Sequence, residues 1–334
     1  MGFRMLSYAG RVVLIRTVLS TLHCYWARIF VIRITVIKKI EAICRRFLWS
    51  GHENGDKMAL VSWESVWRKH GGLEIRNFHN WNLAAIAKYV WWICKKKDNL
   101  WVKWVHSVYL KSGTWMHYEP GYSTSWAWRK ICQVKNMFKT FLFNEDGTSK
   151  TRIYTLKESY KWINGDSEMV EWWPWMTNRW ITPKHSFIIW VIAHQRLLTG
   201  ARMIHLNMTT SGKCYICDES LETVNHLFSS CRYSRRIFEE LGNWCGTKLP
   251  TEDCIKWWLR HRERSATKKK IIGVILAASM YAIWNVRNGA KHEAVVTNQN
   301  YVIRHIKNDV IRRIENLEFK TACPSTRGWI ELLR

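Results

Sequence analysis

Apolar residues recur every three or four positions along most of this chain. The stretches Val12–Leu22, Val36–Trp49, Leu83–Lys96 and Tyr301–Phe319 all show this spacing, which places the apolar side chains on one face of an α-helix. The stretch Ile271–Trp284 is almost continuously apolar but too short to span a bilayer, and we predict a buried helix there. The pattern predicts a mainly α fold.

The helix predicted at Val36–Trp49 divides into two faces. Its inward residues are Val36, Ile37, Ile40, Ile43, Cys44, Phe47 and Leu48. Its outward residues are Lys38, Lys39, Arg45 and Arg46. Four outward cations form a candidate strip for binding a nucleic-acid backbone. An ordinary solvated helix face explains them equally well.

Capping residues indicate where other helices begin. Asn80 or Asn82 is placed to cap the helix that starts at about residue 83, and Asp98 is placed to cap the next one. Pro183 suits the first turn of a helix that runs to about Thr199.

Three further patterns concern turns and cores. The pair Gly71-Gly72 indicates a turn with a positive φ angle. The last helix, Tyr301–Phe319, carries so many charges that we expect it at the periphery. Tryptophans at helical spacing, such as Trp101 and Trp104, are expected in a core because aromatic stripes of this kind usually pack inward.

The charge of the chain is strongly unbalanced. Its 52 Lys and Arg residues against 26 Asp and Glu give a formal net charge of +26. An excess of this size attracts polyanions, and the release of counterions from a nucleic-acid backbone gives affinity that does not depend on sequence. Solubility or an anionic membrane surface are the alternative explanations.

The cysteines do not form a disulfide framework. Ten of them are scattered over 334 residues, whereas disulfide-stabilised domains are short and cysteine-dense. The first twenty residues are interrupted by Arg4, Arg11 and Arg16, so they do not read as a secretory signal. We expect an intracellular, reducing compartment.

One cluster of residue types indicates a chemistry. Cys214, Cys217, His226 and Cys231 follow the spacing C-x2-C-x8-H-x4-C. Thiolates and an imidazole at such spacing can complete a tetrahedral zinc site, and four protein ligands leave no position for water or substrate. We therefore predict one structural Zn²⁺, with the last two ligands near the start of a helix at Glu222–Leu241. A redox C-x-x-C motif or cysteines that are merely buried together are the alternatives.

The sequence around these residues resembles that of a known family. The phrases Leu197-Leu198-Thr199 and Glu222-Thr223-x-x-His226-Leu227-Phe228-x-x-Cys231 are similar to the zinc-binding domain at the C-terminal end of plant LINE-type, non-LTR retrotransposon reverse transcriptases. Segments on both sides of this region extend the resemblance. They are Leu6-Ser7-Tyr8-Ala9-Gly10-Arg11, Arg46-Phe47-Leu48-Trp49 and, at the other end, Trp284-x-x-Arg287-Asn288.

The resemblance implies four regions. Residues 1–50 correspond to a helical thumb-like region that follows the polymerase core, and 51–150 to a helical connection. Residues 151–290 correspond to the small helical zinc-binding domain, and 291–334 to a charged C-terminal helix. The polar stretch 144–151 is the clearest linker signal before the zinc-binding half.

The catalytic residues of the family are not found. Its polymerases use paired aspartates to hold two metal ions, and this sequence contains no Asp-Asp pair. The endonuclease is also missing, and no set of spaced acids on strands indicates a ribonuclease H. We therefore expect no enzyme activity and no small-molecule substrate.

The sequence favours a non-catalytic reverse-transcriptase fragment that binds RNA or DNA nonspecifically. The residues expected to do so are Lys38, Lys39, Arg45, Arg46, Arg260, Arg262, Arg264, Lys268, Lys269 and Lys270. Two alternatives stay open: a zinc-stabilised protein-interaction module, and the product of a decayed element without function. The resemblance implies action on chromosomal DNA and hence in the nucleus. We expect no membrane partner, because the longest apolar run is too short to span a bilayer.

Overall fold

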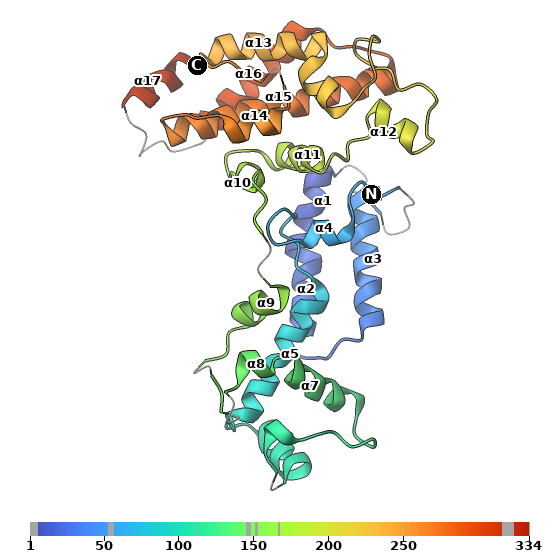
Figure 1. Ribbon diagram of the computed structural model, residues 1–334, viewed down its shortest axis with the longest axis vertical. Helices are drawn as coiled ribbons and strands as arrows, with labels where there is room; N and C mark the ends of the chain where they lie inside the picture. Colours follow the sequence, from blue (N-terminus) through green and yellow to red (C-terminus); the bar gives the residue numbers. More distant parts are fainter. Residues whose placement is uncertain are drawn as a thin grey trace.

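The computed structural model shows an elongated molecule built from helices (Figure 1). It describes residues 6–52, 57–111, 113–144, 148–150, 153–165, 168–250, 252–315 and 324–333. These residues contain no strand, only the isolated β-bridges Phe143–Ser149 and Lys213–Leu221. The predicted mainly α fold is confirmed. Part of the predicted linker, residues 145–147 and 151, lies outside the described residues.

The N-terminal arm is a pair of long helices. α1 (Tyr8–Leu14), the π-helical turn η2 (Ile15–Leu19) and α2 (Ser20–Ala27) follow one another without a break. α3 (Ile34–Ser50) runs back beside them (Figure 1). The short α4 (Trp63–Trp67) follows.

The lower end of the molecule has its own hydrophobic core. Its helices are α5 (Phe78–Cys94), α6 (Leu100–Val105), η3 (His106–Leu110), η4 (Trp115–His117), α7 (Trp126–Met137), α8 (Lys139–Leu142) and α9 (Leu156–Asn164). Trp91, Trp115 and Trp128 are buried there. Of the two tryptophans expected in a core, Trp101 is half-buried and Trp104 is half exposed.

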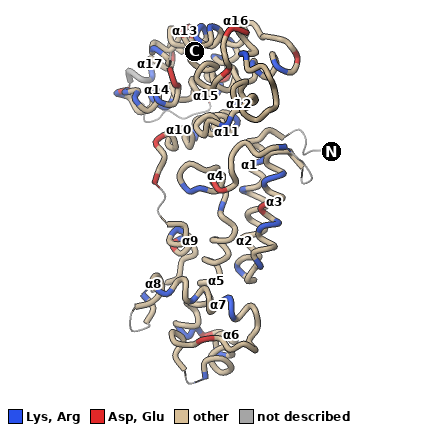
Figure 2. Tube along the Cα trace, turned by 45° about the vertical axis from the view of Figure 1, so that its right-hand side comes forward, with Lys and Arg blue, Asp and Glu red and all other residues tan. Residues whose placement is uncertain are grey.

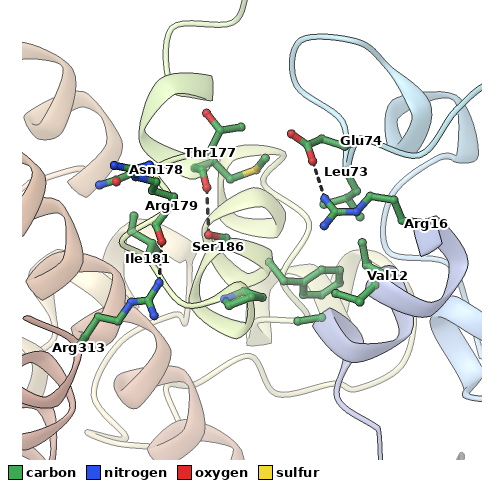
Figure 3. Close-up of a pocket in the computed structure, with 15 residues that line it drawn as sticks. Val12, Arg16, Leu73, Glu74, Thr177, Asn178, Arg179, Ile181, Ser186 and Arg313 are labelled. Carbon is green, nitrogen blue, oxygen red and sulfur yellow. Dashed lines mark hydrogen bonds and ion pairs between the residues drawn. The ribbon is translucent and has the colours of Figure 1, made fainter. Parts of the chain in front are cut away.

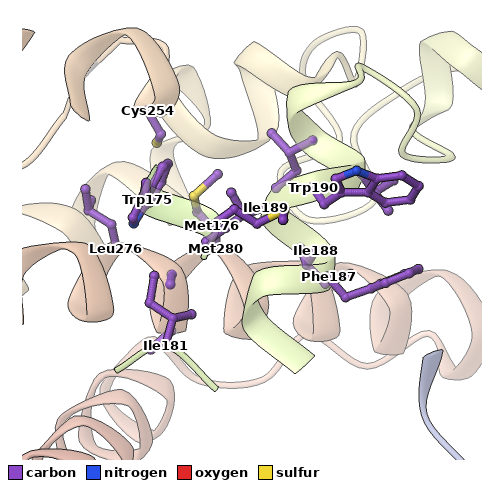
Figure 4. Close-up of a cluster of buried hydrophobic side chains, with 14 of the residues drawn as sticks. Trp175, Met176, Ile181, Phe187, Ile188, Ile189, Trp190, Cys254, Leu276 and Met280 are labelled. Atoms are coloured by element: carbon purple, nitrogen blue, oxygen red, sulfur yellow. The ribbon is translucent and has the colours of Figure 1, made fainter. Parts of the chain in front are cut away.

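The upper end holds the main core. Its helices are α10 (Trp173–Met176), α11 (Pro183–Ala193), α12 (Gly200–His205), η5 (His226–Ser230), α13 (Arg232–Cys245), α14 (Cys254–Arg260), α15 (Ala266–Glu293), α16 (Gln299–Glu315) and α17 (Pro324–Leu333). Trp175, Met176 and Ile189 pack against Leu276 and Met280 of α15 (Figure 4).

α15 is the central helix of this core. All residues from Ile271 to Met280 are buried, which confirms the predicted buried helix. By length and composition alone α15 could cross a membrane, but most of its apolar stretch is buried inside the fold. A mostly buried helix of this kind is also what the core of a globular fold contains.

A glycine turn joins the arm to the upper core. Gly71 has a φ of +123°, as predicted for this pair, and its carbonyl accepts a 2.7 Å hydrogen bond from the indole of Trp190 in α11. Gly72 has a different constraint, since a Cβ atom there would lie 2.4 Å from the carbonyl oxygen of Arg68. The main core therefore includes α1, α3 and α4 as well as the upper helices. The four-region division stays a prediction.

Two predicted caps of α5 are wrong. Asn77 is the cap, and its side chain accepts a hydrogen bond from the amide of Asn80. Asn82 lies inside the helix, where its amide group donates to the carbonyls of Ala27 and Phe30. Asparagine is a common cap, but Asn82 bonds the turn between α2 and α3 instead. It makes these bonds from a position inside the helix.

Two other boundaries also differ. Asn99 rather than Asp98 caps α6, and Asp98 pairs with an exposed lysine instead. α11 ends at Ala193, well before the predicted end at Thr199. Gln195 has a φ of +55°, a left-handed conformation that stops a helix.

The last long helix is not peripheral. Val302, Ile306 and Val310 of α16 are buried against α13 and α15. The many charged residues occupy the other face, so the expectation of a peripheral helix was wrong because it weighed total charge rather than its distribution. Residues 316–319, the predicted end, lie outside the described residues.

α3 buries only part of the face that was predicted to point inward. Ile37, Cys44 and Leu48 are buried, but Val36 is 45% exposed and Ile43 is 39% exposed. The apolar stripe of α3 is wider than its contacts with α1, η2 and α5 can cover. Part of the predicted inward face therefore lies in solvent.

Candidate metal centre

A tight hairpin carries the first two candidate ligands. Lys213 and Leu221 form an antiparallel bridge, and the amide of Cys214 donates to the carbonyl of Ser220 at 2.8 Å. Within the loop the amide of Asp218 donates back to the Cys214 carbonyl at 2.8 Å, and Asp218 has a φ of +57°. This reversal brings the thiols of Cys214 and Cys217 to the same side of the hairpin.

The second pair of candidate ligands follows on two short segments. His226 opens η5, and the hydroxyl of Thr223 accepts a 2.9 Å hydrogen bond from its amide. Cys231 has an extended backbone and is the N-cap of α13. The single helix predicted at Glu222–Leu241 is therefore wrong. A regular helix cannot point residues five apart to one place, and the π-helical turn plus the extended Cys231 does so.

The four side chains converge. The ligand atoms of Cys214, Cys217, His226 and Cys231 all lie within 4.8 Å of one another, and the cysteines are buried. The Nε2 atom of His226 is 3.4 Å from the Sγ atom of Cys217. Zinc bonds of about 2.3 Å to sulfur and 2.0 Å to nitrogen, at tetrahedral angles, would put these atoms about 3.5 Å apart. The cluster therefore has the donor set and spacing of a four-ligand metal site.

The ionisation of the cluster suits metal binding. The Cys214 thiol donates to the Cys231 sulfur, and this bond lowers the pKa of Cys231 and raises the pKa of Cys214. The backbone amides of Tyr233 and Ser234 at the start of α13 also lower the pKa of Cys231. Burial lowers the pKa of His226, which keeps its imidazole neutral. A metal needs thiolates and a neutral imidazole, so its binding would release the protons that the three cysteine thiols hold in its absence.

A buried ion pair supports the hairpin from behind. Glu222, which is fully buried, accepts hydrogen bonds of 2.9 and 2.8 Å from the guanidinium of Arg287 in α15. The same carboxylate accepts bonds from the amides of Gly200 and Tyr215. Arg287 also donates to the carbonyl of Leu198 at 2.8 Å.

This pair fixes where the cluster sits in the fold. It connects the hairpin to α15 and to the start of α12. Spacing rules did not single out Glu222 and Arg287, although both belong to the phrases that carry the family resemblance. Those phrases were the one signal in the sequence that could have found them.

Comparison with known proteins identifies this part of the chain. Residues 154–238, which include all four cluster residues, match the family described as zinc-binding in reverse transcriptase. This segment is similar to that family. No catalytic domain is part of the match.

Two curated relatives come from Arabidopsis thaliana. One, named "Putative ribonuclease H protein", is 28% identical over 185 residues, which is 54% of this chain and 26% of the relative. The other, an uncharacterized mitochondrial protein, is 26% identical over 135 residues, which is 40% of this chain and 86% of the relative. The chain thus spans about a quarter of the first relative. Together the matches confirm the resemblance to a fragment of a plant retrotransposon reverse transcriptase.

The predicted nucleic-acid-binding residues lie in two separate places. Lys38, Lys39, Arg45 and Arg46 are exposed on α3 in the arm. Arg260, Arg262 and Arg264 are exposed on and after α14 in the upper part. Figure 2 shows α3 and α14 well apart. The structure does not bring the two groups together into one strip.

The three lysines at the start of α15 are already engaged. Lys268 is 3.5 Å from Glu263, and its ammonium lies over the ring of Trp329. Lys269 lies over the Trp258 ring. Lys270 lies over the Trp180 ring. Such contacts hold the stems against the core while the charge stays near the surface.

A pocket between α1 and α11 is not a second candidate site. It has a volume of about 370 Å³ and lies where the arm meets the upper core (Figure 3). Arg16 and Glu74 pair with each other at 2.5 Å. Arg313 donates to the carbonyls of Arg179 and Trp180. The first pair lies within the arm and the second set of bonds within the upper core, so these charged groups already have partners in the fold.

Proposed function

We propose that Cys214, Cys217, His226 and Cys231 bind one structural Zn²⁺. The observation that carries the proposal is the convergence of four buried or half-buried protein ligands on one point. All tetrahedral positions are filled by protein, which is the arrangement of structural rather than catalytic zinc. The ion would cross-link the hairpin to the start of α13.

Elemental analysis tests this proposal. The parent protein should contain one zinc per chain, and the Cys214→Ser, Cys217→Ser double variant none, with a loss of helical circular dichroism. Cys94→Ser, at a half-buried cysteine outside the cluster, is the control and should keep the metal. A soluble, folded parent without zinc would contradict the proposal.

We further propose that the chain binds nucleic acid nonspecifically. Support comes from the net charge of +26, from the exposed basic residues of α3 and α14, and from the match to a reverse-transcriptase family. Titration of the protein with a labelled nucleic acid should show the binding affinity falling by roughly a thousandfold between 50 and 200 mM salt, if about six phosphates are contacted. Affinity that stays flat over this range would count against the proposal.

We also propose that the chain acts without catalysis of its own. The cluster at the hairpin is the one group among the described residues that could hold a metal, and it has no open position. Purified protein given a primed template and nucleotides should therefore produce no extended primer, and clear extension would refute this.

One surface is where a protein partner, the alternative function, would also bind. α2 and the turn that follows it expose large apolar residues, among them Leu22, Trp26 and Phe30. Contiguous apolar surface of this kind marks a place where something binds.

A further inference from the structure

A hydrophobic groove runs between α2 and α3. Its volume is about 440 Å³. Its lining is hydrophobic except at His23, and the residues are Leu19, Leu22, His23, Trp26, Phe30, Ile32, Val36, Ile40, Ile43 and Cys44. Trp26 is 52% exposed and Phe30 55% exposed. Apolar side chains of this size remain in solvent at a cost, so the groove has the character of a binding surface.

Two aromatic rings stand together at the surface of the groove. The rings of Trp26 and Phe30 are stacked, with their centroids 5.8 Å apart and their planes 25° apart. Tyr25, also exposed, meets the Trp26 ring edge-on at 5.3 Å. Exposed aromatic faces are the surfaces on which proteins stack unpaired bases.

The segment that forms the groove is basic. Residues 6–52 contain one acid, Glu41, and eight basic residues, which are Arg11, Arg16, Arg28, Arg33, Lys38, Lys39, Arg45 and Arg46. Lys39 and Arg46 alternate with Val36 and Ile43 at a spacing of three or four, so the charges border the groove on the same side of α3. A second copy of this chain would bring two such basic faces together, whereas a polyanion complements them.

A buried histidine in the groove lacks partners. His23 is 4% exposed, and neither of its ring nitrogens has a hydrogen-bond partner among the described residues. Burial lowers the pKa of His23 to about 4, so the ring is neutral at pH 7 and offers one donor and one acceptor. Both nitrogens are buried, and the ring packs against Phe78 with the ring centroids 4.6 Å apart, so His23 forms part of the floor of the groove without adding a charge to it.

We propose that the groove between α2 and α3 binds unpaired bases of a single-stranded nucleic acid. Trp26 and Phe30 supply the stacking faces, and Lys39 and Arg46 contact phosphates. The inference rests on the proposed nucleic-acid binding and names its substrate class and its place.

Fluorescence anisotropy with the full chain tests the inference. The probes are a labelled oligothymidylate of about 15 nucleotides and a labelled duplex of the same length, which matches the usual size of single-strand sites. Trp26→Ala should weaken binding of the single strand about tenfold and change duplex binding less than about twofold. Trp26→Phe, which keeps an aromatic face, should bind nearly as the parent does. Trp104→Ala removes a similarly exposed tryptophan from α6 and should have no effect.

The outcomes separate the two proposals. If the parent binds neither probe, the proposed nucleic-acid binding fails and the inference with it. If the parent binds both probes, and Trp26→Ala weakens single-strand binding relative to duplex binding no more than Trp104→Ala does, the inference alone is wrong. If Trp26→Ala leaves single-strand affinity intact but turns a dimer into a monomer, the groove is a protein interface, which also overturns the inference. If Trp26→Ala loses helical content, Phe30→Ala replaces it as the variant that lacks a stacking face. Its single-strand affinity is then compared with that of Trp26→Phe.

Discussion

At the scale of single residues, Arg287 connects several parts of the fold around the candidate metal centre. Its side chain is buried, and it joins Glu222 of the hairpin to the Leu198 carbonyl before α12. The guanidinium also lies over the rings of Tyr215 and Trp284. A buried charge of this kind is tolerated because every side of it has a partner, and removing one partner leaves the other charge uncompensated.

Arg287→Met should therefore lower the free energy of unfolding by about 3–5 kcal/mol, measured by urea denaturation. The control is Arg232→Ala, which breaks the exposed pair with Glu219 and should cost less than about 1 kcal/mol. Adding Glu222→Gln to Arg287→Met should restore part of the loss. Equal effects of Arg287→Met and Arg232→Ala would show that the buried pair has no special weight.

At the scale of elements, the contact between α11 and the turn after α4 depends on close approach of the backbone. The carbonyl of Gly71 accepts the indole hydrogen bond of Trp190, and Gly72 fits closely against the carbonyls of Val66 and Arg68. The turn thus anchors the arm to the upper core through atoms that any side chain at Gly72 would displace.

Gly72→Ala should destabilise the protein by about 1–3 kcal/mol, because its Cβ atom would lie 2.4 and 2.5 Å from two backbone oxygens. Gly121→Ala is the matched change, since nothing lies within 4 Å of a Cβ atom there, and it should stay within about 0.5 kcal/mol. Thermal melting of the two variants decides the matter. A Gly72→Ala protein as stable as Gly121→Ala would mean that the turn relaxes freely.

At the scale of the whole molecule, two hydrophobic cores are separate. The candidate metal ligands Cys214, Cys217 and Cys231 belong to the main core, while α7 belongs to the lower one. Local opening follows such cooperative units. A metal bound at the hairpin would therefore stabilise one end of the molecule more than the other.

Removing the metal with a chelator should raise amide hydrogen exchange in α11, α13 and α15 and leave the protection of α7 nearly unchanged. Mass spectrometry of peptides from each helix measures this, with the Cys214→Ser, Cys217→Ser variant as a second route to the metal-free state. Loss of protection in α7 to the same degree would show that the two cores unfold as one.

What could be predicted from the sequence was mainly local. The positions of the helices and the convergence of the four ligands depend on residues close together in the sequence. The spacing of those residues was therefore sufficient to predict them. The exposure of Val36 and Ile43 could not be predicted, because it depends on how much of α3 the neighbouring helices cover. The position of Asn82 inside α5 has the same origin, since its partners lie fifty or more residues away. The buried pair of Glu222 and Arg287 likewise joins residues far apart in the chain.

The elongated outline of the molecule (Figure 1) has a hydrodynamic consequence. A long particle diffuses more slowly than a sphere of equal mass, so a single chain of 39.9 kDa will elute from a sizing column ahead of globular standards of its own mass. Elution volume alone would then imitate a dimer. Light scattering, which reports mass regardless of outline, is the measurement that should decide how many chains are present.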